Sequence, residues 1–285
     1  METALNELPL AIFTTLAPLG AGAFVVLAIA VCSLKLEVGQ LKAIDRLSLI
    51  PAGAVAAGFV ASFFHLASPL HAPSVFMGIG HSPLSNEIAV GMVFFAAMAV
   101  YVLLGMFGKL SLSVRKPFSL VVAVLALIFV VFTGLAYMMP TIPSWNSPLV
   151  PLEMLGMALF GGTLIGLFVL ALAGAIDGRA AHMVKSLAFI LGFSGFVAAA
   201  VALVGHVDML GELWSPAVAG ATLAEPVVPY LCGAGLCGVV AVACLGVVCF
   251  GKRTLAPAAV GSAVALVGTF LVRFAFYAMQ MSIGL

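Results

Sequence analysis

Three ionisable side chains lie within long apolar segments, where charge is costly: His65, Glu87 and Arg273. A histidine exchanges protons near neutral pH, a carboxylate can pass a proton on, and a guanidinium can stabilise an oxygen that becomes negative. Ionisable groups inside membrane-spanning segments commonly mark functional sites. We therefore expect these three side chains to form a pocket in which a proton leaves a substrate.

The composition identifies the surroundings of the chain. Of the 285 residues, 64% are hydrophobic and 7% are charged, and the mean hydropathy is +1.30. A soluble domain carries roughly 25% charged residues, which keep its surface hydrated. Most of this chain must therefore contact lipid. The net charge of +1 gives no reason to expect nucleic acid as a partner.

Eight apolar runs reach the length of about 20 residues that a helix needs to cross a bilayer. We predict an all-α integral membrane protein whose eight transmembrane helices form a single domain over residues 1–285. Pro117 and Pro151 should open the fourth and fifth helices, and the small residues Gly162 and Gly166 should allow close helix packing. The first basic residue is Lys35, so the first run should be a retained helix and not a cleaved signal peptide. The runs lie near residues 9–34, 47–67, 86–107, 117–139, 151–174, 183–205, 229–250 and 255–281.

The basic residues indicate the orientation of these helices. Ten of the eleven Lys and Arg residues lie in alternate connections: Lys35, Lys42 and Arg46; Lys109, Arg115 and Lys116; Arg179 and Lys185; Lys252 and Arg253. Positively charged connections face the cytoplasm. We therefore predict a multi-pass protein with both termini on the extracytoplasmic side.

The same alternation places the three ionisable groups at one level. Arg273 follows the cytoplasmic Arg253 by 20 residues, which corresponds to about 30 Å of helix at 1.5 Å per residue. His65 ends the second run and Glu87 begins the third, so both should lie near the same outer boundary. Tyr277 lies on the Arg273 face of the last helix. Gln280, seven positions after Arg273, also lies on this face.

Each of these residues has a structural alternative. Arg273 could extend to the outer interface and remain hydrated. His65 could stabilise the carboxyl end of the second helix. Glu87 could face the amino end of a helix capped by Ser85, and Glu153 could do the same at the start of the fifth run.

The cysteines and histidines bear on possible cofactors. The five cysteines form no CxxC or CxxCH motif, so we expect no iron–sulfur cluster, no covalent haem and no metal in this protein. A b-type haem needs two facing histidines, and only His65 and His206 could meet. We expect no haem. A b-type cytochrome subunit and a proton-coupled transporter are the alternative functions.

Several segments resemble the membrane anchor (C) subunit of the dimethyl sulfoxide reductase family. They run from one end of the chain to the other: Glu7–Thr14, Phe59–Pro69 with Leu84–Ile88, Ile142–Trp145 with Gly161 and Gly162, and Arg273–Tyr277. Two positions depart from the family pattern, because Ala67 replaces an expected glycine and Glu153 is foreign to it.

The resemblance implies a function. It implies a quinol-oxidising anchor subunit in the bacterial cytoplasmic membrane that binds menaquinol near the outer face and releases protons outside. The electrons would pass to a ferredoxin-like iron–sulfur subunit docked on the outer face, and then to a molybdopterin catalytic subunit. The quinol-binding histidine of the family falls on His65 and its acidic partner on Glu87. The further quinol contacts that we expect are Ser68, Asn86, Arg273, Tyr277 and Gln280.

Overall fold

The structure is a computed structural model that describes residues 2–65, 75–178, 181–214 and 219–281. All regular elements in these ranges are helical. In sequence order they are α1 (Glu2–Asn6), α2 (Leu8–Ser33), α3 (Val38–Leu47), α4 (Leu49–Phe63), α5 (Pro83–Met106), α6 (Leu112–Leu135), α7 (Leu149–Leu172), α8 (His182–Glu212), α9 (Gly220–Ala224), the 3-10 helix η3 (Glu225–Val227), α10 (Val228–Phe250) and α11 (Leu255–Ala278).

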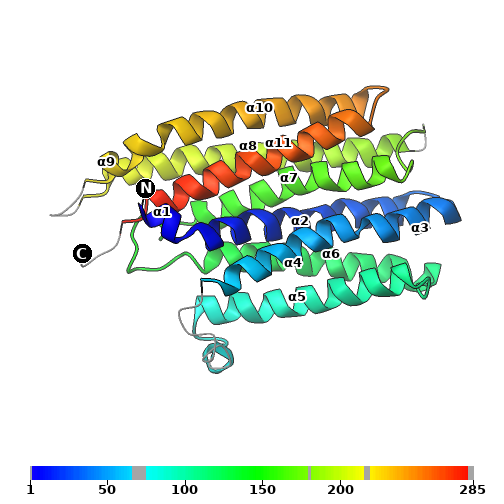
Figure 1. Cartoon of the computed structure of the whole chain (residues 1–285), viewed down its shortest axis with the longest axis horizontal. Helices are drawn as coiled ribbons and strands as arrows, with labels where there is room; N and C mark the ends of the chain where they lie inside the picture. The colour runs from blue at the N-terminus through cyan, green and yellow to red at the C-terminus, as the bar shows by residue number, and fades with distance from the viewer. Residues whose placement is uncertain (1, 66–74, 179–180, 215–218, 282–285) are drawn as a thin grey trace.

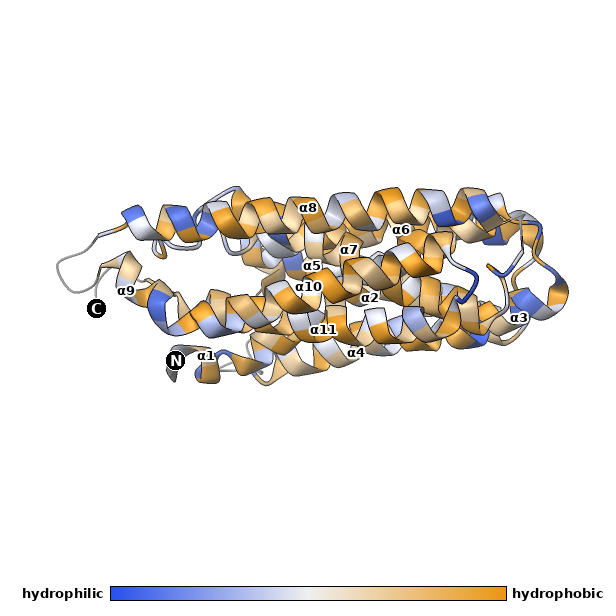
Figure 2. Ribbon diagram, turned by 90° about the horizontal axis from the view of Figure 1, so that it is seen from above, coloured by the Kyte–Doolittle hydropathy of each residue, from blue (hydrophilic) through white to orange (hydrophobic). Residues whose placement is uncertain are grey.

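Eight helical stretches of the described residues are long and apolar enough to cross a membrane. Six of them are single helices, and the other two combine α3 with α4 and α9 with α10. Hydrophobic residues cover most of the length of the helices, and hydrophilic residues gather toward the two ends of the bundle (Figure 2). The prediction of an all-α protein with eight membrane-spanning helices is confirmed.

Several helix ends differ from the predicted ones. Pro117 lies inside α6, which begins at Leu112, and Pro151 is the third residue of α7, which begins at Leu149. A proline removes only one main-chain hydrogen bond, and near a helix end the freed carbonyl can contact water. Helix α8 continues to Glu212, beyond the predicted end at residue 205.

The long helices run along a common axis, with α2 and α7 at the centre (Figure 1). Helix α2 packs against α4, α6, α7 and α11, and α7 packs against α2, α6, α8 and α11. The first four spans and the last four spans therefore form two groups that meet where α2 contacts α7.

Glycines allow the backbones of α2 and α7 to touch. A Cβ atom at Gly22 would lie 2.0 Å from the Ala158 carbonyl oxygen, and one at Gly162 would lie 2.5 Å from the Gly22 carbonyl carbon. A Cβ atom at Gly166 would lie 2.8 Å from the Val26 side chain. Close packing at Gly162 and Gly166 is confirmed, and it fixes the depth of α7 relative to α2.

The two ends of the bundle differ in the connections and ionisable residues that they carry. The end that carries α3 holds the connections between α2 and α3, α5 and α6, α7 and α8, and α10 and α11 (Figure 1), and Lys35, Lys109 and Lys252 lie in three of them. Helix α1 and the carboxyl end of α11 lie at the opposite end. The carboxyl end of α4 and the amino end of α5 lie there as well, so His65, Glu87 and Arg273 occupy this end.

Candidate functional site

A buried polar cluster surrounds Arg273 at the end of the bundle that carries α1. The Arg273 side chain has no exposed surface. Its Nη1 donates a hydrogen bond to Glu153 Oε1 at 3.2 Å, and its Nε donates to Thr14 Oγ1 at 3.1 Å. The guanidinium thus joins α11 to α7 and α2. The alternative in which Arg273 extends to the outer interface is wrong.

Aromatic rings enclose the same guanidinium. The Arg273 Cζ atom lies 4.0 Å from the centroid of the Phe276 ring, 5.4 Å from that of Tyr277 and 5.5 Å from that of Tyr137. The Tyr277 and Tyr137 hydroxyls are hydrogen-bonded to each other at 2.5 Å, and the Tyr277 hydroxyl also lies 3.4 Å from Thr14 Oγ1. The cation therefore faces π surfaces in place of water, and Tyr277 shares the Arg273 face as predicted.

Glu153 and His206 belong to this cluster, although the sequence did not identify them as site residues. Because α7 begins at Leu149, Glu153 is its fifth residue and lies beyond the first turn, so the helix-dipole interpretation of Glu153 is wrong. Both side chains are buried, and His206 Nδ1 lies 3.8 Å from Glu153 Oε2. The sequence did contain a signal for this pairing. Glu153 and Arg273 lie at the same depth in two apolar spans, and opposite charges inside a membrane usually pair.

Glu87 is the fifth residue of α5. This helix begins at Pro83, and Ser82 is its N-cap residue, with Oγ accepting a hydrogen bond from the Ser85 N–H at 3.4 Å. The expectation that Ser85 caps this helix is therefore wrong. Glu87 lies beyond the first turn and is buried, so interaction with the amino end of the helix does not explain it.

The surroundings of Glu87 connect it to the same cluster. Its carboxyl group lies beside the Thr133 hydroxyl and within electrostatic range of Arg273. It also interacts electrostatically with Tyr137, which contacts Tyr277. Its Oε1 has no hydrogen-bond partner in the part of the protein that the structure describes. Glu87 and Arg273 thus lie together, as the sequence predicted.

His65 occupies a different position, at the rim of the bundle. It follows the end of α4 at Phe63, and its Nδ1 lies 3.2 Å from Glu7 Oε2. The two side chains are 41% and 21% exposed. Across the described ranges, no hydrogen bond or ion pair joins His65 to Glu87 or Arg273. The structure therefore brings two of the three predicted groups into one cluster and leaves the histidine at its edge.

The remaining predicted contacts are less central. Ser68 lies outside the described residues. Asn86 Oδ1 accepts a hydrogen bond from the Gly80 N–H at 2.6 Å, so its carbonyl oxygen holds the preceding loop. Gln280 is half-buried just beyond the end of α11. Trp145 is buried and stacks on Phe276 at 5.1 Å between ring centroids.

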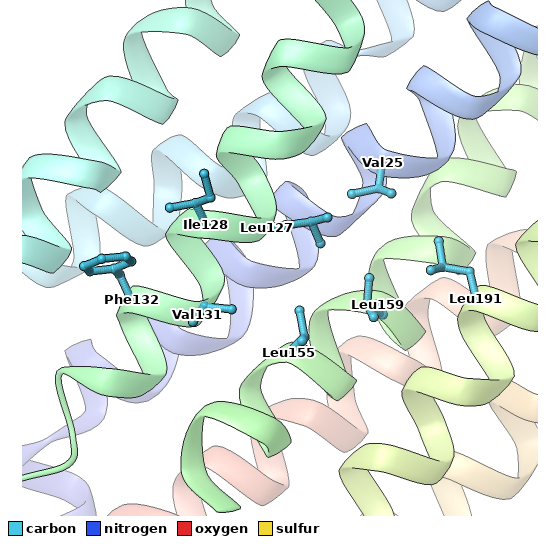
Figure 3. Close-up of a pocket in the computed structure, with 8 residues that line it drawn as sticks. All are labelled: Val25, Leu127, Ile128, Val131, Phe132, Leu155, Leu159 and Leu191. Atoms are coloured by element: carbon cyan, nitrogen blue, oxygen red, sulfur yellow. The ribbon is translucent and has the colours of Figure 1, made fainter. Parts of the chain in front are cut away.

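A hydrophobic groove of about 380 Å³ lies between α6 and α7, with contributions from α2 and α8 (Figure 3). Every side chain that lines it is apolar: Val25, Leu127, Ile128, Val131, Phe132, Leu155, Leu159 and Leu191. Such a groove suits a hydrocarbon tail but offers no partner for a ring oxygen. A polar head group would need the cluster around Arg273.

Metal binding requires several ligating side chains close together. Over residues 2–65, 75–178, 181–214 and 219–281, no three His, Cys, Asp or Glu side chains lie close enough together to hold a metal ion. The polar cluster consists of one guanidinium, two carboxyl groups, one imidazole and several hydroxyls. Its chemistry is hydrogen bonding and proton transfer.

Comparisons with known proteins identify relatives of this protein. Residues 1–279 match the family described as DMSO reductase anchor subunit (DmsC). The C subunit of the anaerobic dimethyl sulfoxide reductase of Escherichia coli (strain K12) is 36% identical over 193 residues, which cover 66% of this sequence and 65% of the relative. The C subunit of the Haemophilus influenzae enzyme is 32% identical over 52% of this sequence and 53% of the relative. The anaerobic dimethyl sulfoxide reductase subunit YnfH of Escherichia coli (strain K12) is 31% identical over 61% of each sequence.

The aligned part thus spans less than two thirds of each relative. The family match over nearly the whole length shows that this protein belongs to the DMSO reductase anchor subunit family.

Proposed function

We propose that this protein anchors a molybdenum-containing reductase in the bacterial cytoplasmic membrane and oxidises menaquinol near the outer face. The observation that carries this proposal is Glu87. It is a carboxyl group buried in an apolar span, with one oxygen unpartnered within the described residues, beside the charge of Arg273. Buried polar groups are nearly always hydrogen-bonded. This oxygen is therefore available to a substrate hydroxyl or to a transferred proton.

The orientation of the protein supports an outer site. Basic connections at the α3 end of the bundle support a cytoplasmic position for that end. In this orientation the cluster around Arg273 would lie near the extracytoplasmic surface, together with α1 and the carboxyl end of α11. The exposed side chains at this end include Asp208, Glu212 and Glu225, which would present acidic groups to a partner.

The contact between His65 and Glu7 prepares the histidine to accept a hydrogen bond. A carboxylate at 3.2 Å from Nδ1 favours a proton on that nitrogen. The Nε2 atom of neutral His65 then has a free lone pair. A quinol hydroxyl at the rim would donate to this atom, and the partly exposed imidazole would release the accepted proton to the outer solution.

Glu87 and Arg273 would act on the buried side of the quinol. Oxidation of a quinol to a quinone releases two protons and two electrons. Glu87 Oε1 would accept a hydrogen bond or a proton from the second hydroxyl. Arg273 would stabilise negative charge near Glu87 as the proton moves.

The electrons must leave this protein through a partner. The cysteines form no iron–sulfur motif, so we propose that an iron–sulfur subunit docks on the outer face, close to the site. A molybdopterin subunit would complete the complex and reduce the terminal acceptor. If both protons leave on the outer side, quinol oxidation does not itself generate a membrane potential.

One structural feature argues against the alternative of a proton-coupled transporter. Carriers commonly break a helix around a charge near the middle of the bilayer. Here α11 runs continuously from Leu255 to Ala278 through Arg273, and the charged cluster lies toward one end of the bundle. A helix that is intact at its charged residue fits a fixed redox site better than a moving gate.

The test separates quinol oxidation from the rest of the complex. In the purified complex, His65→Ala and Glu87→Gln should each lower quinol-dependent reduction of the terminal acceptor by about 100-fold or more, a typical loss for a group that transfers a proton. Reduction by an artificial dye donor, which bypasses the membrane subunit, should remain. Full quinol turnover in both variants would place the site elsewhere.

Matched controls come from exposed residues of the same types. His81 is an exposed histidine on the same side of the protein, and Glu37 is an exposed glutamate at the opposite end. His81→Ala and Glu37→Gln should leave both activities unchanged. A loss of quinol oxidation in these controls would indicate a general defect of assembly.

A further inference from the structure

His206 and Glu153 present two hydrogen-bond acceptors to each other. His206 Nε2 lies 2.7 Å from the Ser144 main-chain carbonyl oxygen, so this nitrogen must carry a proton and donate it. In the neutral imidazole, Nδ1 is then an acceptor. It lies 3.8 Å from Glu153 Oε2, which is also an acceptor. Neither atom has a hydrogen-bond donor within the described residues.

Arg273 does not resolve this conflict. Its Nη1 bonds to Oε1, the other oxygen of Glu153, and its Nη2 makes no hydrogen bond to Glu153 or His206 and has no partner among the described residues. Buried acceptors without donors are rare, because burial removes their hydrogen bonds to water. With the imidazole neutral and the carboxylate ionised, this contact lacks one donor among the described residues, and a bound hydroxyl would supply it.

A cavity borders the Glu153 side of this contact. It has a volume of about 150 Å³, lies between α7, α8, α10 and α11, and has Glu153 among its lining residues. The other lining residues are almost all apolar, and many are small, including Ala200, Gly235 and Gly238. Gly235 is exposed and Ala200 is half-buried, so the cavity opens toward lipid between α8 and α10.

We propose that this cavity is a second binding site, for a lipid-borne molecule of the hydroquinone class whose hydroxyl donates to Glu153 Oε2. The assignment of the ligand class rests on the proposed function. The small volume admits part of a ring system, since complete ligand pockets have about 300–1,000 Å³. The tail would run outward between α8 and α10. This site belongs to the last four spans, whereas His65 and Glu87 belong to the first four.

Photolabelling of the assembled complex tests the proposal. The probe is a naphthoquinol with a diazirine on a short alkyl tail, and the labelled peptides are identified by mass spectrometry. Label should appear on peptides of α8 and α10 as well as near α4 and α5. Excess unlabelled naphthoquinol should suppress it, and added phosphatidylethanolamine should not.

Two glycines on α10 provide a matched pair of variants. A Cβ atom at either Gly235 or Gly246 would have no atom of another residue within 4 Å, so both positions accept a larger side chain. They are 11 residues apart, which places them on nearly the same face, about 16 Å apart along the helix. Only Gly235 lines the cavity. Gly235→Phe should reduce labelling of α8 and α10 about tenfold, whereas Gly246→Phe should leave it unchanged.

Glu153→Gln tests the acceptor itself. It should reduce the same labelling about tenfold, because the carboxamide can donate to His206 Nδ1 and removes the need for an external donor. Gly235→Phe keeps the Glu153–Arg273 pair and thus covers the case in which Glu153→Gln does not fold.

The outcomes separate this proposal from the proposed function. Label on α8 and α10 that persists in Gly235→Phe, or that phosphatidylethanolamine displaces equally, overturns the second site. Label confined to α4 and α5 with normal quinol turnover also overturns it and leaves the proposed function intact. Absence of both labelling and quinol oxidation in the unmodified complex would overturn both.

Discussion

Two buried arginine–carboxylate pairs lie at opposite ends of the bundle, and they differ in how completely they are bonded. At the α3 end, both oxygens of Asp45 accept hydrogen bonds from Arg115, one from Nη1 and one from Nη2 at 2.9 Å. At the other end, Glu153 bonds to Arg273 through Oε1 alone, and its Oε2 has no donor within the described residues.

We interpret the difference as that between a structural pair and a pair available for binding. The Asp45–Arg115 pair joins α3 to α6, and the part left unpaired there is the Nε–H of Arg115. Around Arg273, by contrast, atoms of four side chains lack a hydrogen-bond partner among the described residues: Glu87 Oε1, Glu153 Oε2, His206 Nδ1 and Arg273 Nη2. Incomplete hydrogen bonding in a buried cluster is therefore the feature on which we base the proposed site at this end of the protein.

The largest expected effect comes from breaking each pair. Arg273→Met and Arg115→Met should each lower the free energy of unfolding by about 3–5 kcal/mol, because each leaves a buried carboxylate without a counter-ion. Glu153→Gln and Asp45→Asn, added to the respective variants, should restore most of this loss. Unfolding in detergent, followed by circular dichroism, measures both effects.

Turnover should then distinguish the two repaired variants. The double variant of Asp45 and Arg115 should keep quinol oxidation within about twofold of the unmodified complex. The double variant of Glu153 and Arg273 should remain about 100-fold lower, because it restores stability but not the charge beside the substrate. Equal turnover in the two double variants would show that the pairs do not differ in role.

A smaller effect is expected where α2 meets α7. Gly22→Ala would place a methyl group 2.0 Å from the Ala158 carbonyl oxygen, so the helices must separate. The expected loss is about 1–3 kcal/mol in the free energy of unfolding. Quinol oxidation should also fall, because Thr14 on α2 and Glu153 on α7 both contact Arg273.

Gly53→Ala is the matched control for this substitution. A Cβ atom at Gly53, in α4, would have no neighbour within 4 Å. Alanine there should leave turnover unchanged and stabilise the helix by up to about 1 kcal/mol. If Gly22→Ala were as neutral as this control, the backbones of α2 and α7 would not be in contact.

The smallest effect on quinol oxidation is expected from the contact between Glu7 and His65 at the rim of the bundle. Glu7→Gln removes the charge that faces His65 Nδ1, in a pair that is partly exposed. Such pairs contribute about 0–1 kcal/mol, which corresponds to at most about a fivefold change in affinity. KM for the quinol should rise within this range, with kcat nearly constant. A fall in kcat of several orders of magnitude would instead place Glu7 among the proton-transfer groups.

The lengths of the apolar runs were sufficient to predict the eight spans. The positions of Lys and Arg were sufficient to predict which connections lie at the same end of the bundle. Depth along the helices was also predictable, and it brought Glu87 and Arg273 to one level. The face that each helix turns toward its neighbours was harder to predict from the sequence. Tyr277 was placed on the correct face from the i+4 spacing, but the pairing of Arg273 with Glu153 depends on how α7 and α11 turn toward each other.

Small errors in the predicted helix ends changed the role that we expected for two buried carboxyl groups. A predicted start at Pro151 placed Glu153 in the first turn of a helix, where a carboxylate is common and needs no other explanation. The true start at Leu149 moves it to the fifth position. The same shift occurs at Glu87, because α5 begins at Pro83 and not at residue 86. Propensity signals locate helix ends only to within a few residues, and here that margin separates a capping residue from a buried site residue.

Ser144 is a buried residue that contacts two separate parts of the protein. This residue lies in the connection between α6 and α7, where its carbonyl oxygen accepts from His206 and its hydroxyl accepts from the Met281 N–H at 2.9 Å. One peptide thus determines which nitrogen of the buried imidazole bears hydrogen and also fastens the segment that follows α11. A displacement of this connection would therefore change both the hydrogen bond of His206 and the position of the segment after α11.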